Sequence, residues 1–97
     1  MNSDIFLDLI RTIDGFFQKK IKLPSLLLRM ETLNSLLMER GFEWDFDFED
    51  GMLGIDIVCG NMSLEGRSDM SPDEKLEVEF FLREVSELAK KETMSDE

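Results

Sequence analysis

Histidine and tyrosine are absent from this 97-residue chain, and cysteine occurs once, at Cys59. Without histidine the chain cannot build a histidine-based catalytic triad or a histidine-ligated zinc site. A single cysteine excludes an internal disulfide. We therefore expect a non-enzymatic protein that needs no metal and no cofactor. Cys59 is expected to be a thiol of the core and not a nucleophile.

Basic residues are scarce. The chain has 11 lysines and arginines against 22 aspartates and glutamates, so its net charge is −11. Direct binding to nucleic acid is not expected, because contact with phosphates needs clustered basic side chains. No apolar run approaches the roughly 18 residues of a membrane span, and the N-terminus lacks the basic start of a signal peptide. These features predict a single cytoplasmic domain over residues 1–92 and a frayed tail over 93–97.

Three segments show the period of an amphipathic helix. They cover about residues 4–20, 24–40 and 72–91. Pro24 suits the first position of the second helix, and Gly41 is placed to end that helix. Ser71 and Glu74 have the spacing of a capping box, which predicts the start of the third helix.

The period changes to two between the second and third of these helices. Aromatic and acidic residues alternate over 42–49, and aliphatic residues alternate over 53–59. Between them lies Asp50-Gly51, a pair that favours the two-residue turn of a β-hairpin. The predicted fold is therefore α+β, with two layers in the order α-α-β-β-α. Met62 and Leu64 are expected to add a short third strand.

The hairpin prediction gathers carboxylates on one face. In its register the aromatic residues face the aliphatic ones, and Asp45 lies directly opposite Asp56, which is destabilising for a strand pair. Such local conflicts are more common at functional sites. The stretch 43–56 has six acidic residues and no basic one. The predicted partner-binding residues are Glu43, Asp45, Asp47, Glu49 and Asp56.

Other interpretations of the same residues remain open. The face could serve solubility alone. Asp45, Asp47, Glu49 and Asp56 also fall at positions 1, 3, 5 and 12 of a calcium-binding loop, although the glycine of that motif is one place late. On the third helix, Phe80 lies to the side of the apolar stripe. Phe80 is therefore either part of a wide core contact or an exposed partner contact.

Residues 9–21, LIRTIDGFFQKKI, resemble the helical opening of small bacterial toxin-immunity proteins. The resemblance implies a protein that binds a cognate toxin, often a basic nuclease, through an acidic surface. We expect an inhibitor of immunity or anti-restriction type, a monomer or homodimer, whose partner is a basic nuclease or nucleic-acid-binding protein. The alternative is a homodimeric adaptor or secretion chaperone that uses apolar surface.

Overall fold

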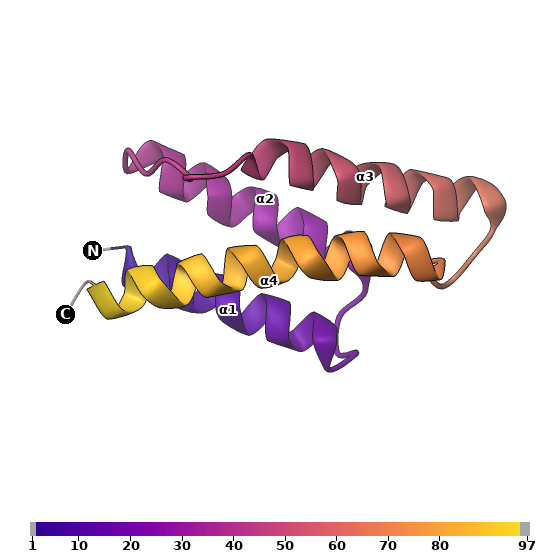
Figure 1. Cartoon of the computed structure of the whole chain (residues 1–97), viewed down its shortest axis with the longest axis horizontal. Helices are drawn as coiled ribbons and strands as arrows, with labels where there is room; N and C mark the ends of the chain where they lie inside the picture. The colour runs from indigo at the N-terminus through magenta and orange to yellow at the C-terminus, as the bar shows by residue number, and fades with distance from the viewer. Residues whose placement is uncertain (1, 96–97) are drawn as a thin grey trace.

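The structure, a computed structural model, describes residues 2–95, and these residues form four helices with no strand. The helices are α1 (Ser3–Phe17), α2 (Leu23–Glu39), α3 (Phe48–Glu65) and α4 (Pro72–Ser95). Successive helices run in opposite directions, so α1 begins and α4 ends at the same end of an elongated bundle (Figure 1). Each helix packs against two others, in the ring α1–α2–α3–α4–α1.

The α+β prediction is wrong in its middle segment. Residues 42–47 form an irregular loop between α2 and α3, and both the expected second strand and the expected third strand lie within α3. Asp50 and Gly51 are in the first turns of this helix and form no hairpin turn. This segment is a helix because the apolar residues that it buries, Phe48, Met52, Ile55 and Val58, have helical spacing. Leu53 and Ile57, which the strand pattern also required to be buried, are exposed.

The other three helices were predicted within a few residues of their bounds. α1 ends at Phe17, earlier than expected, and α4 continues to Ser95. Residues 96–97 of the expected tail lie outside the described residues. Among residues 2–95, no helix combines the length and the apolar character that crossing a bilayer requires.

The core runs the length of the bundle and takes side chains from all four helices. Leu9, Ile13, Leu26, Leu37 and Val85 are among its fully buried members. Burial of this kind of apolar surface is the main favourable term in folding, at about 25 cal/mol per Å².

Three of the helices, α1, α2 and α3, end in left-handed turns. After α2, Gly41 has φ of 83°, and the Phe42 amide donates to the Leu37 carbonyl at 3.0 Å. This geometry confirms Gly41 as the residue that ends the helix. α1 ends in the same way at Lys19, whose φ of 62° is unusual for a residue with a side chain.

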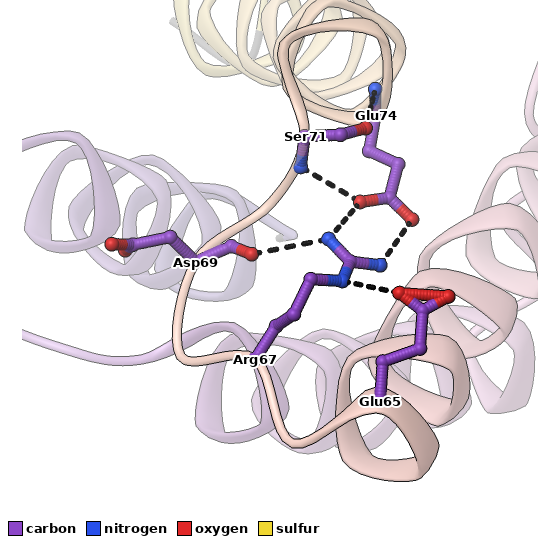
Figure 2. Close-up of polar contacts among 5 residues, drawn as sticks. All are labelled: Glu65, Arg67, Asp69, Ser71 and Glu74. Carbon is purple, nitrogen blue, oxygen red and sulfur yellow. Dashed lines mark hydrogen bonds and ion pairs between the residues drawn. The ribbon is translucent and has the colours of Figure 1, made fainter.

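The connection between α3 and α4 is held by Arg67 (Figure 2). Its guanidinium donates to both carboxylate oxygens of Glu74, at 2.8 and 3.2 Å, and to Glu65 at 2.6 Å. Glu74 also accepts from the Ser71 amide at 2.8 Å, while the Ser71 hydroxyl accepts from the Glu74 amide at 3.3 Å. The predicted capping box is confirmed, and Arg67 extends it to α3.

The helices α3 and α4 approach closely at Gly51. A Cβ atom at this position would lie 2.2 Å from Cε1 of Phe81. The Phe81 ring is buried and is held between Phe46 and Phe48, so it has little room to move. Gly51 is therefore required by helix packing. At Gly54, one turn later, a Cβ would meet nothing within 4 Å.

We expect Gly51→Ala to destabilise the protein by about 1–3 kcal/mol, the usual cost of overpacking a core. The matched control is Gly54→Ala, which should stabilise it by about 0.5–1 kcal/mol, because alanine restricts the unfolded chain and fits the open space. Urea denaturation followed by circular dichroism measures both. Equal effects of the two substitutions would contradict the close approach at Gly51.

The Arg67 network also predicts a pH dependence. The hydrogen bond from Arg67, followed by that from the Ser71 amide, lowers the pKa of Glu74 from 4.5 to about 2. Because the pKa is lower in the folded state, Glu74 stabilises the fold above pH 4.5, and this contribution disappears as the pH falls towards 2. We expect Glu74→Gln to lower the urea midpoint near neutral pH, with a difference from the parent that shrinks below pH 4.5.

Asp69→Asn is the control for this experiment, since only the main-chain carbonyl of Asp69 accepts from Arg67 and its carboxylate points away from the network (Figure 2). Its midpoint should follow that of the parent across the same range. A Glu74→Gln deficit that stays constant down to pH 2 would show that the lost stability does not come from the ionised carboxylate.

Candidate protein-binding surface

Three of the five predicted acidic residues, Glu43, Asp45 and Asp47, lie on a segment whose aromatic side chains fix it to the bundle. The loop over 40–47 lies beside the end of α2 before α3 begins (Figure 1). Within it, Phe42, Trp44 and Phe46 are half-buried and pack against the core. The intervening Glu43 and Asp45 are exposed. The alternation seen in the sequence is therefore real, but it belongs to a loop and not to a strand.

Trp44 is the centre of this aromatic cluster. Its ring is stacked on Phe48 with the centroids 4.2 Å apart and the planes inclined by 5°. It makes edge contacts with Phe42 at 5.0 Å and with Phe6 of α1 at 6.4 Å. The indole N–H donates to Oδ1 of Asn34 on α2 at 2.7 Å. These contacts join the loop to three helices and hold the backbone from which the carboxylates project.

Asp47 has a structural role that the sequence interpretation missed. Its side chain accepts a hydrogen bond from the Asp50 amide at 3.0 Å and so caps the start of α3. The signal was present in the sequence, because aspartate is a preferred residue just before the first turn of a helix, where its side chain accepts from an amide of that turn. Asp47 is still exposed, so it contributes negative charge to the surface as well.

Glu49 and Asp56 lie on α3 itself. Both are exposed, and their seven-residue separation places them on the same side of the helix, two turns apart. The predicted pairing of Asp45 with Asp56 is wrong, because the hairpin that would place them opposite one another does not exist. The structure instead separates the five predicted residues into a loop group (Glu43, Asp45, Asp47) and a helix group (Glu49, Asp56). α3 contains no lysine or arginine, so no basic side chain of that helix neutralises them.

The calcium interpretation finds no support in this arrangement. Within residues 2–95, no three cysteine or carboxylate side chains are placed to hold a metal ion together. A helix that starts at Phe48 separates the residues which a calcium loop would have to bring around one ion.

Cys59 is half-buried on α3. Burial raises the pKa of its thiol, and the nearby Asp56 carboxylate raises it further. Both effects favour the uncharged thiol, whereas a nucleophilic cysteine needs a lowered pKa.

No known protein family matches the chain, and neither the curated proteins nor the solved structures contain a match.

The cap at Asp47 gives a test that separates its structural role from its charge. Asp47→Ala should destabilise the protein by about 1 kcal/mol, while Asp47→Asn should cost little, because asparagine caps about as well as aspartate. Asp45→Ala is the control and should have almost no effect on the urea midpoint. If Asp47→Asn were as destabilising as Asp47→Ala, the carboxylate charge and not the cap would be the important feature.

Proposed function

We propose that this chain is a non-enzymatic inhibitor, of immunity or anti-restriction type, that binds a basic nuclease or nucleic-acid-binding protein. The contact surface consists of the exposed carboxylates Glu43, Asp45, Asp47, Glu49 and Asp56. The predicted surface was one face of a hairpin; in this proposal it consists instead of the loop over 40–47 and the helix α3. The observation that supports it most is the anchoring of the loop by Trp44, because a fixed backbone presents its carboxylates in one arrangement.

Two further features favour the proposal. The charge is concentrated, since residues 43–97 hold 17 acidic and five basic residues while residues 1–42 are nearly balanced. A field of one sign attracts an oppositely charged protein and speeds its association. The resemblance of residues 9–21 to immunity proteins points to the same class. The single cysteine fits a reducing, cytoplasmic setting, which forms part of the proposal.

The runner-up function is an interaction module, such as a homodimeric adaptor or a secretion chaperone. One observation favours it: several large apolar side chains of α3 and α4 are exposed. The two functions differ in the force that holds the partner, and so they differ in their response to salt.

The test is a comparison of baits in a pull-down from host lysate. The site variant carries Glu43→Gln, Asp45→Asn and Asp56→Asn and spares the cap at Asp47. We expect the parent to retain a basic protein at low salt, and the site variant to retain roughly threefold to a hundredfold less of it, since three lost charge contacts at a surface remove about 0.6–3 kcal/mol in total.

The matched control carries Asp14→Asn, Glu31→Gln and Asp69→Asn, which remove the same charge from exposed positions outside the proposed surface. It should retain the partner as the parent does. Equal retention by all three baits would refute the proposed surface, and retention that high salt does not weaken would favour the interaction module.

A further inference from the structure

The helix α3 has a second apolar stripe on the side that faces away from the core. Leu53 is 55% exposed, Ile57 is 54% exposed and Leu64 is 88% exposed. Their spacing of four and seven residues places them on one face of the helix. A surface helix usually has one apolar stripe, which it buries. α3 buries Phe48, Met52, Ile55 and Val58 and leaves the other stripe uncovered.

The neighbouring helix continues this apolar surface. Leu76 and Phe80 of α4 are 69% and 67% exposed. Gly54 of α3 and Glu77 of α4 line a common groove between the two helices. Ile57 follows Gly54 by three positions, and Phe80 follows Glu77 by three positions. Each therefore lies about 60° further outward on its helix than the residue that lines the groove. The two side chains therefore lie along opposite edges of the groove.

Two glycines of α3 line the groove, but only Gly54 leaves open space, because the Phe81 ring fills the space beside Gly51. Gly51 and Gly54 present no side chain there, and Val78 and Phe81 lie beneath. A groove between two antiparallel helices with apolar edges is the kind of surface into which an amphipathic helix packs. The distance from Leu53 to Leu64 is about 16 Å along α3, which corresponds to three turns of such a helix.

The charges around the groove decide which helix it accepts. Asp50 and Glu77 line the groove itself, and Glu49 and Asp56 flank the apolar stripe on α3. The nearby basic residues are turned away. Arg83 pairs with Glu79 and lies over the Phe17 ring of α1 at 6.0 Å. Lys75 precedes Glu77 by two residues and so lies on nearly the opposite side of α4.

We propose that the groove between α3 and α4 binds an amphipathic helix of a partner protein, with apolar residues on one side and lysines or arginines along its edges. A second copy of this chain would set carboxylates against carboxylates, which costs free energy at an interface. The inference rests on the proposed function in one respect, the basic character of the partner. It adds that the partner binds through an amphipathic helix.

The test uses a fluorescein-labelled peptide of about 15 residues, with leucines at helical spacing on one face and lysines elsewhere. Its binding to the full chain is followed by fluorescence anisotropy. The groove variant is Ile57→Gln with Phe80→Gln, and the control is Leu28→Gln with Met38→Gln, two exposed apolar residues of α2. We expect the groove variant to bind at least about tenfold more weakly, because each apolar side chain contributes about 1.5 kcal/mol or more when buried. The control should match the parent.

Two further measurements complete the test. A scrambled peptide of the same composition, without an apolar face, should bind at least about tenfold more weakly than the amphipathic one. Light scattering on the unbound protein should show a monomer for both the parent and the groove variant. Urea midpoints close to that of the parent would establish that the variants are folded.

Three outcomes would overturn the inference: equal binding by the groove variant and the control, equal binding of the two peptides, or a parent dimer that the groove variant abolishes. The last outcome would assign the groove to a second copy. The proposed function fails separately, when the carboxylate variant retains the same partner as the parent. A partner that depends on the carboxylates and is insensitive to the groove variant would refute the groove alone.

Discussion

The stacking of Trp44 on Phe48 is the contact on which the acidic surface depends. Phe48 begins α3, and Trp44 is in the loop before it, so the stacked pair fixes the loop to the start of the helix. Phe48 also packs against Phe81 of α4, and Phe81 in turn covers Gly51. One aromatic cluster thus sets the path of the loop and the close approach of α3 to α4. It also holds the loop backbone from which the exposed Glu43 and Asp45 project.

Three of the helices, the end of α2 and the start of α4 could be predicted from the sequence, because their signals are local. Gly41 and the Ser71–Glu74 box act within a few residues, and the apolar stripes of α1, α2 and α4 have one clear period. α3 was missed because it has two apolar stripes. Leu53 and Ile57 on the outer face interleave with Ile55 and Cys59 on the inner side, and together they imitate the alternation of a strand. The helical spacing of Phe48, Met52 and Ile55 was the signal that distinguished the two.

One part of the candidate site, the loop carboxylates, could be predicted from the alternation of acidic and aromatic residues. Glu43 and Asp45 are exposed in a strand and in this loop alike, since both conformations separate acidic from aromatic side chains. The positions of Glu49 and Asp56 depend on the secondary structure, so the error in α3 changed their neighbours. The groove could not be predicted at all, because it requires knowledge of which face of α3 meets α4.

The arrangement of α3 makes sense if binding occurs in two stages. On the proposed function, its carboxylates act over a distance of about 8 Å in physiological salt and so influence how fast a basic partner arrives. Its exposed leucines and isoleucine act only in contact, and they influence how long the partner stays. Neither feature is needed to hold the bundle together, because the inner stripe of α3 already supplies its share of the core. The outer apolar face of α3 and the carboxylates beside it therefore add little to the stability of the bundle, which is why we propose this face as a surface for binding.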